Sequence, residues 1–168
     1  MSHTLDADTT ELVTLQINGH AHSAPDTLTG TLLSTLREDL RLTAAKRGCN
    51  QGVCGAYTVL VDGRTVRACL TLSHNASESQ VQTLEGLRDE PLMRALQSQF
   101  LAHGAFQCGF CTSGMLVSAY ALLRKAPEPT EAEVRAAMSG NLCRCTGYQK
   151  IVAAVTAAGR AFGQGERA

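Results

Sequence analysis

Alternating apolar and polar residues mark the first half of the chain as strand-forming. Residues 12–17 alternate in this way, and Asn18-Gly19 directly after them is a strong signal for a two-residue hairpin turn. Asp62-Gly63 repeats this turn signal further along the chain. Strands are therefore predicted over residues 12–17, 20–24, 57–61, 64–67 and 81–83.

Apolar residues at helical spacing mark one early segment and most of the chain after residue 90. Asp26 or Thr29 can cap the early segment, while Thr130 and Glu133 form a capping box before a later one that Gly140 follows. Helices are predicted over residues 28–40, 91–102, 113–125, 131–139 and 148–162.

Strands that come first and helices that follow predict an α+β fold with two domains. A length of 168 residues permits two small domains, each with a modest core. We expect a flexible leader over residues 1–10, a first domain over 11–87, a helical domain over 88–163 and a polar tail over 164–168. Four short helices of the second domain would form a small bundle around a cofactor.

Composition and charge exclude several classes of protein. Hydrophobic residues make up 44% of the chain, as in globular proteins, and no apolar run approaches the length of a membrane span. Lysine plus arginine number 15, as do aspartate plus glutamate, so no basic surface should attract nucleic acid or an anionic membrane. We therefore expect neither a nucleic-acid partner nor a membrane span.

The chain contains seven cysteines, and these are its most informative residues for chemistry. The chain begins with polar and acidic residues and shows no charged-then-apolar signal or twin arginine, so a cytoplasmic, reducing compartment is expected. Clustered cysteines in such a compartment usually bind metal, and an odd number cannot pair fully as disulfides.

The later cysteines form a complete set of metal ligands. Cys108 and Cys111 are spaced C-x2-C, and Cys143 and Cys145 are spaced C-x-C. A bound cation deprotonates such thiols and gathers them around it. A set of four cysteines suits either a zinc ion or an iron–sulfur cluster.

The earlier cysteines have the spacing of a plant-type 2Fe–2S site in which one ligand is replaced. Cys49 and Cys54 are spaced C-x4-C in a glycine-rich loop, and Cys69 follows at a distance. Tyr57 stands where the third cysteine of that spacing belongs. Three interpretations are open: Tyr57 ligates iron as a phenolate, the cluster is lost and Tyr57 begins a strand, or Tyr57 is a cysteine altered through a single base.

Both groups of cysteines sit in longer motifs, and these carry a family resemblance. The motifs are Gly48-Cys49 to Cys54-Gly55, Cys69, Gln107-Cys108-Gly109-Phe110-Cys111 and Asn141-Leu142-Cys143-Arg144-Cys145-Thr146-Gly147-Tyr148. Over residues 12–163 the chain resembles the small iron–sulfur subunit of the molybdenum hydroxylases. This is the family of xanthine dehydrogenase, aldehyde oxidoreductase and aerobic carbon monoxide dehydrogenase. The sequence departs from the family at Tyr57 and at Ser113, where the family usually has proline and where serine can cap a helix.

The resemblance implies a fold and two cofactor sites. It implies a ferredoxin-like β-grasp domain followed by a four-helix bundle, each holding one 2Fe–2S cluster. The ligands implied for the helical domain, nearest molybdenum, are Cys108, Cys111, Cys143 and Cys145. Those implied for the other cluster are Cys49, Cys54 and Cys69, with Tyr57 at the third position. Gln107 and Cys145 are the residues that the family places against the pterin.

The resemblance also implies partners and a role. A large subunit would carry molybdopterin and a medium subunit FAD, in a heterotrimer or a dimer of heterotrimers. Single electrons would pass from molybdenum through the clusters towards FAD or another acceptor. No catalytic set of side chains emerges from the sequence, so a non-catalytic redox subunit is expected. The alternatives are a free-standing iron–sulfur shuttle or sensor and a structural zinc-binding module.

Overall fold

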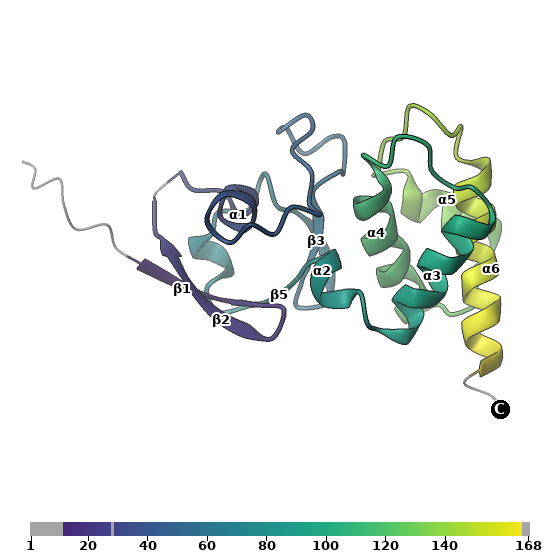
Figure 1. The fold of residues 1–168 in the computed structure, drawn as a ribbon, viewed down its shortest axis with the longest axis horizontal. Helices are drawn as coiled ribbons and strands as arrows, with labels where there is room; N and C mark the ends of the chain where they lie inside the picture. Colours follow the sequence, from purple (N-terminus) through teal and green to yellow (C-terminus); the bar gives the residue numbers. More distant parts are fainter. Residues whose placement is uncertain (1–11, 28, 166–168) are drawn as a thin grey trace, which may run out of the picture.

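The structure is a computed structural model, and it describes residues 12–27 and 29–165. The leader expected over residues 1–10 lies outside the described residues. The described part places a β-sheet at one end and helices at the other (Figure 1), so the expected α+β order is confirmed. Among the described residues, no helix is both long and apolar enough to cross a membrane.

In the described part of the chain, a five-stranded sheet has the order β2-β1-β5-β3-β4. Its strands are β1 (Leu12–Ile17), β2 (His20–Pro25), β3 (Thr58–Val61), β4 (Arg64–Arg67) and β5 (Gln80–Gln82). Two antiparallel hairpins, β1–β2 and β3–β4, flank β5, which runs parallel to β1 and antiparallel to β3. The residues of both hairpin turns adopt positive φ, as the turn signals require.

The helix predicted over residues 28–40 is shorter than expected. Helix α1 (Leu32–Ser34) runs directly into one turn of π-helix, Thr35–Asp39. The cap is Thr31, whose side chain accepts a hydrogen bond from the Ser34 backbone N–H, and neither Asp26 nor Thr29 fills this role. Thr31 also forms a β-bridge with Leu72, and the Gly30 N–H donates to the Thr27 carbonyl in a turn, so the helix begins only after Thr31.

After a short 3-10 turn (His74–Ala76) and helix α2 (Leu84–Leu87), the chain becomes helical. The remaining helices are α3 (Pro91–Ala102), α4 (Thr112–Lys125), α5 (Glu131–Met138) and α6 (Gln149–Gly165), so α6 continues past its predicted end at residue 162. The predicted capping box at the start of α5 is present between Thr130 and Glu133.

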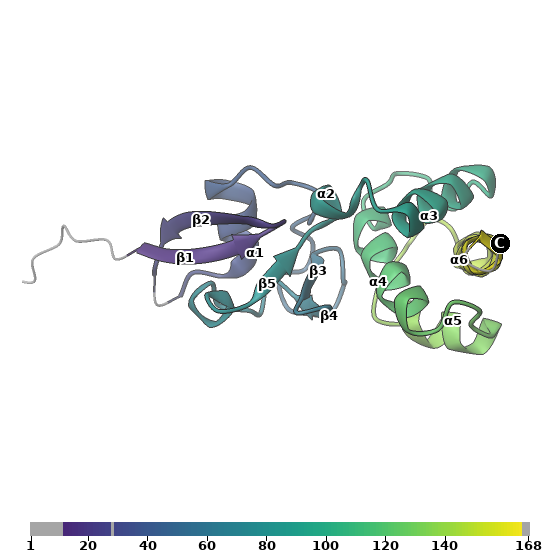
Figure 2. The same ribbon diagram turned by 90° about the horizontal axis from the view of Figure 1, so that it is seen from below.

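Helix α4 is the element that joins the two ends of the molecule. It packs against β3 and β4 on one side and against α3 and α5 on the other, while α6 contacts α3 and α5 (Figure 2). Among the described residues, buried apolar side chains form two clusters. One lies under the sheet around Leu15, Leu36 and Tyr57, and the other lies between the helices around Met115 and Val155. Cys69 belongs to the first cluster, with Cys49 and Cys54 packed against it, and Cys111 and Cys143 pack against the second.

Candidate functional site

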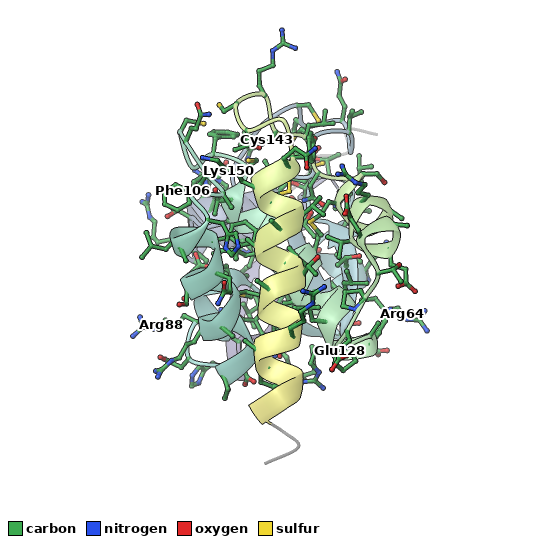
Figure 3. The ribbon with its side chains drawn as sticks, turned by 90° about the vertical axis from the view of Figure 1, so that its right-hand side faces the viewer. Arg64, Arg88, Phe106, Glu128, Cys143 and Lys150 are labelled. Atoms are coloured by element: carbon green, nitrogen blue, oxygen red, sulfur yellow. The ribbon has the colours of Figure 1, made fainter. Side chains whose placement is uncertain are left out.

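The four later cysteines meet in two pairs, and each pair joins the two motifs. Cys108 and Cys111 lie between α3 and α4, and Cys143 and Cys145 lie between α5 and α6. Figure 3 shows Cys143 near the N-terminal end of α6. The Sγ atoms of Cys108 and Cys145 are 3.7 Å apart, and the Cys143 thiol lies close enough to Cys111 to raise the pKa of the Cys111 thiol. Two thiolates on one tetrahedral metal with bonds of about 2.3 Å are about 3.8 Å apart, so the first pair already has this spacing.

The paired thiols differ in exposure and in acidity. Cys108 and Cys145 are exposed, and Cys111 and Cys143 are partly buried. Burial, followed by the neighbouring Cys143 thiol, raises the pKa of Cys111 to about 12. Although burial of Cys143 opposes its ionisation, hydrogen bonds from Thr146, together with those from Cys145 and Cys111, lower the Cys143 pKa. The contact with Cys108 raises the pKa of Cys145. A cation bound between such thiols would favour their thiolate forms.

Side chains within the 141–148 loop fix the position of the C-x-C motif. The Tyr148 hydroxyl accepts a hydrogen bond from the Cys143 backbone N–H at 2.9 Å and donates one to the Asn141 carbonyl at 2.8 Å. The Thr146 hydroxyl donates to Cys143 Sγ at 3.1 Å. Gly147 and Tyr148 have φ of 62° and 68°, so the chain makes a tight left-handed turn before α6.

Gln107 links the two cysteine motifs. Its side-chain amide Nε2 donates a hydrogen bond to the Cys145 carbonyl at 3.0 Å, and the contact is exposed. The two residues for which the family resemblance implies a pterin contact, Gln107 and Cys145, therefore lie side by side.

The donor set in the helical half fits a 2Fe–2S cluster. Four soft sulfur ligands are present, and two pairs match the two ligands that each iron of such a cluster needs. Among the described residues, no group of three or more histidine, cysteine, aspartate or glutamate side chains is placed to hold a metal ion. Two separate pairs favour two irons over a single zinc ion.

The cysteines in the first half are held by backbone N–H groups. Cys49 Sγ accepts from the N–H groups of Gln51 at 3.4 Å and Cys54 at 3.3 Å, and Cys54 Sγ accepts from the Cys49 N–H at 3.4 Å. Gly52 and Gly55 have φ of 78° and 69°, as expected for a loop that turns its N–H groups toward sulfur.

Tyr57 points into this group of thiols. Its side chain is 0% exposed, and its hydroxyl lies 2.8 Å from Cys49 Sγ. The thiols of Cys54 and Cys69 also lie close enough to act on the pKa of the hydroxyl. Burial, and then these three thiols, raise the pKa of Tyr57 well above its ordinary value. The hydrogen bond from Tyr57 is the main reason that the pKa of the Cys49 thiol is lowered to about 6.

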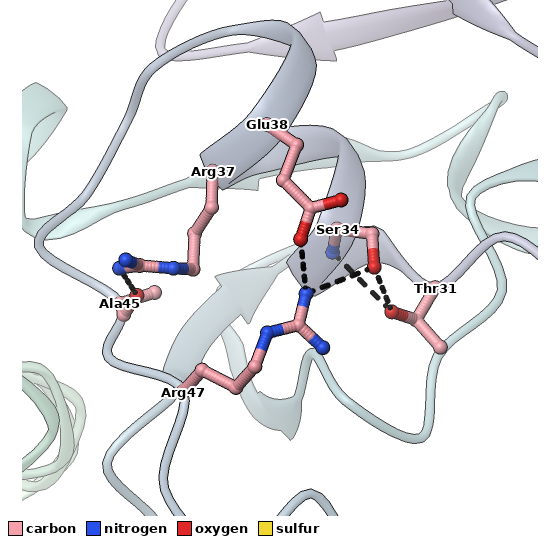
Figure 4. Close-up of polar contacts among 6 residues, drawn as sticks. All are labelled: Thr31, Ser34, Arg37, Glu38, Ala45 and Arg47. Atoms are coloured by element: carbon pink, nitrogen blue, oxygen red, sulfur yellow. Dashed lines mark hydrogen bonds and ion pairs between the residues drawn. The ribbon is translucent and has the colours of Figure 1, made fainter.

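The segment that leads into this loop is tied to the first helical turns (Figure 4). The Arg47 guanidinium forms an ion pair with Glu38 at 2.5 Å and a hydrogen bond to Ser34 Oγ at 3.1 Å. Arg37 donates to the Ala45 carbonyl at 2.7 Å. Arg47 thus connects the segment before Cys49 to the first helical turns, within the same half of the molecule.

The two cysteine loops are joined to each other through Asn141, which is buried. Its Nδ2 donates to the Gly55 carbonyl at 2.9 Å and to Thr58 Oγ1 at 3.2 Å, and its Oδ1 accepts from Ser118 Oγ at 2.8 Å. The backbone N–H of Leu142 donates to the Cys54 carbonyl at 2.9 Å. Sequence reasoning gave Asn141 no role, although it opens the motif that contains Cys143.

Ser113 does not act as the expected cap. Helix α4 begins at Thr112, and its N-cap residue is Cys111. Among the described residues, the buried Ser113 hydroxyl has no hydrogen-bond partner. The prediction for Ser113 was wrong because the helix starts one residue earlier and places this side chain inside the structure.

Comparisons with known proteins agree with this architecture. Residues 12–99 match the family described as 2Fe-2S iron-sulfur cluster binding domain, and residues 83–156 match the family described as [2Fe-2S] binding domain. The chain is 50% identical over 143 residues to the nicotinate dehydrogenase small FeS subunit of Eubacterium barkeri, covering 85% of this chain and 91% of that protein. It is 49% identical over 143 residues to the nicotine 6-hydroxylase small subunit of Paenarthrobacter nicotinovorans, covering 85% of this chain and 86% of that protein.

A solved structure gives the same result for the fold. Quinoline 2-oxidoreductase from Pseudomonas putida 86 has a chain that superposes with a TM-score of 0.83 at 44% identity, covering 93% of this chain and 98% of that one. Its likeness extends over both the sheet and the helices. The protein therefore belongs to the small iron–sulfur subunits of the molybdenum hydroxylases, as a non-catalytic redox subunit of an oxidoreductase.

Proposed function

We propose that this chain relays single electrons from a molybdenum centre on a partner subunit towards FAD or another acceptor. The observation that carries the proposal is the meeting of Cys108 with Cys145 and of Cys111 with Cys143. These residues would hold a 2Fe–2S cluster, which supplies reversible one-electron chemistry.

The exposed pair marks where electrons would enter. Cys108 and Cys145 are exposed, whereas Cys111 and Cys143 are partly buried. We propose that Gln107 and Cys145 contact the pterin of a large molybdopterin subunit. The Gln107 amide and the Cys145 carbonyl are hydrogen-bonded to each other, so both lie on the surface that such a partner would cover.

Exposed apolar residues support a partner at this surface. Large hydrophobic side chains that are exposed and lie next to a cysteine in sequence are Val53, Leu70, Phe110 and Leu142. Exposed apolar side chains grouped around a polar site are typical of interaction surfaces. We propose the large molybdopterin subunit as their partner. The complex would add a medium FAD subunit, as a heterotrimer or a dimer of heterotrimers in the cytoplasm.

We further propose that the chain divides into a ferredoxin-like β-grasp domain over residues 11–87 and a four-helix bundle over 88–163. Two separate apolar clusters support this division. One contains buried residues between Val13 and Val81, and the other contains mainly residues between Leu87 and Ala158.

Replacing a ligand in the assembled complex tests the relay. In Cys108→Ser the helical cluster should be lost, so substrate would still reduce molybdenum while reduction of the acceptor falls at least tenfold. Nicotinate and quinoline are the first substrates to try, because relatives are named for enzymes acting on these rings. Iron content, electron paramagnetic resonance and anaerobic stopped-flow absorbance measure each step.

Thr156→Ser on α6, away from the cysteines, is the control and should leave iron content and acceptor reduction unchanged. Three outcomes would contradict the proposal. They are one zinc and no iron per chain, purification without a pterin-bearing partner, and normal acceptor reduction in Cys108→Ser.

A further inference from the structure

We infer that Tyr57 closes the first cysteine site, so that this chain carries a cluster in its helical half alone. The inference concerns Cys49, Cys54 and Cys69, whereas the proposed function rests on the other four cysteines. Residues 12–99 belong to a family of 2Fe–2S-binding domains, yet the side chains present here do not fit that cofactor. Three features of the site support the inference: the number of ligands, the space between the sulfurs and the backbone at Tyr57.

The first step is the count of ligands. A plant-type 2Fe–2S cluster is held by four cysteine thiolates. All seven cysteines lie within the described residues, and the four in the helical half are engaged with one another. The first site is therefore left with three thiols, and the fourth group that faces them is the Tyr57 phenol.

The second step is the space between the sulfurs. A cysteine at position 57 would end one bond beyond Cβ and leave room for iron and sulfide. The tyrosine instead carries an aromatic ring across this room, and its oxygen ends 2.8 Å from Cys49 Sγ. An oxygen and a sulfur bound to the same tetrahedral metal, at about 2.0 and 2.3 Å, would be about 3.5 Å apart. The observed contact is a hydrogen bond, and it is too short for two ligands of one iron.

The third step is the backbone around Tyr57, which holds the ring in place. A phenolate ligand would require this segment to retreat, because the oxygen lies much farther from its backbone than a cysteine sulfur does. The segment is instead fixed on both sides: the Ala68 N–H donates to the Tyr57 carbonyl at 3.3 Å, and the Lys46 N–H donates to the Ala56 carbonyl at 2.9 Å. The side chain is 0% exposed and packs in the core under the sheet.

Tyr57 thereby keeps the loop in place, as a bound cluster would do. Its hydroxyl is hydrogen-bonded to Cys49 Sγ at 2.8 Å, and the loop keeps the positive φ angles at Gly52 and Gly55. The carbonyls of Cys54 and Gly55 then remain in place to bind Leu142 and Asn141 beside the helical cysteines. The loop that Tyr57 fills therefore supports the cysteine site in the helical half.

The test uses the purified complex, with iron, acid-labile sulfide and electron paramagnetic resonance measured per chain. The wild type should contain about two irons and one signal, and Tyr57→Cys should gain a second cluster, giving about four irons and two signals. Tyr57→Phe, which has neither thiol nor phenol oxygen, should keep about two irons. Four irons in the wild type that fall to two in Tyr57→Phe would show phenolate ligation and overturn the inference, as would failure of Tyr57→Cys to gain iron.

Cysteine replacements separate this inference from the proposed function. Cys69→Ser should leave wild-type iron unchanged, but in the Tyr57→Cys background it should remove the added cluster. Cys108→Ser should remove all iron from the wild type. If iron survived Cys108→Ser but was lost in Cys69→Ser, both ideas would fail. If Cys108→Ser and Cys69→Ser each removed half, the relay would stand and the inference would fall.

Discussion

At the scale of single residues, Asn141 links the two halves of the molecule by the hydrogen bonds of its side chain. It is 2% exposed, and its amide bonds to three groups on two segments: Gly55 and Thr58 where β3 begins, and Ser118 on α4. A buried polar group stripped of its partner costs about 1–3 kcal/mol. These hydrogen bonds join the two halves of the molecule where their cysteine loops meet, so their loss should destabilise both loops.

Asn141→Ala should therefore lower the free energy of unfolding by about 1–3 kcal/mol, because the buried Ser118 hydroxyl loses its partner and the Gly55 carbonyl, which Thr58 still bonds, loses one of its hydrogen bonds. Thermal and denaturant unfolding of the complex measure the change. The matched control is Asn75→Ala at an exposed position, which should be neutral. Equal stability of the two variants would show that the amide bridge does not hold the halves together.

Tyr57 also shows how far a single residue can be understood from sequence. The spacing of Cys49, Cys54 and Cys69 identified the position as abnormal, and this needed only counting. The direction of the ring could not be predicted in the same way. It depends on the hydrogen bond from the Ala68 N–H to the Tyr57 carbonyl and on the packing of the ring under the sheet. Both are contacts between separate segments of the chain.

At the scale of elements, local signals were sufficient wherever a turn or a cap is encoded by neighbours. Each predicted strand lies within one residue of the observed one, and for the four strands of the two hairpins the Asn18-Gly19 and Asp62-Gly63 turns fix the register. The first helix was overestimated because Thr31 pairs with Leu72 across the fold. A partner that is distant in sequence leaves no local pattern in the residues that it constrains.

The capping box of α5 gives a prediction that belongs to this scale. Thr130 Oγ1 accepts from the Glu133 N–H at 3.3 Å, and Glu133 Oε2 accepts from the Thr130 N–H at 2.7 Å. Thr130→Ala should destabilise the protein by about 1 kcal/mol, measured by denaturant unfolding. Hydrogen bonds from the Thr130 hydroxyl and then its backbone N–H lower the pKa of Glu133.

The pH dependence of the same cap has a definite sign. Because the folded-state pKa of Glu133 is lowered, its ionised form adds stability above the unfolded-state pKa, and this is lost as pH falls through the folded value. The difference in Tm between wild type and Glu133→Gln should be constant near neutral pH and shrink below about pH 4. A difference that grows in acid would contradict the assignment.

At the scale of the whole molecule, the fold brings two cysteine loops to the contact between the sheet and the helices. Helix α4 provides the common support, since its first turn follows Cys111 and its length packs on β3 and β4. Gly114 on that turn lies so close to the Gly55 carbonyl that a β-carbon would overlap it. The cysteine site in the helical half and the loop of Cys49 and Cys54 are therefore one structural unit, even though we assign a cluster to the helical site alone.

The last prediction concerns assembly, for which exposed apolar residues supply a matched pair. Leu142 is 51% exposed and follows Asn141 directly before Cys143, whereas Leu101 is 70% exposed at the end of α3 and adjoins no cysteine. If the large subunit covers the cysteine loops, Leu142→Ser should weaken its binding by about tenfold, as the loss of a central apolar contact costs more than about 1 kcal/mol. Leu101→Ser removes a more exposed leucine and should leave binding unchanged. Titration of the large subunit with each variant, followed by calorimetry, distinguishes them, and equal weakening by both would place the partner elsewhere on the surface.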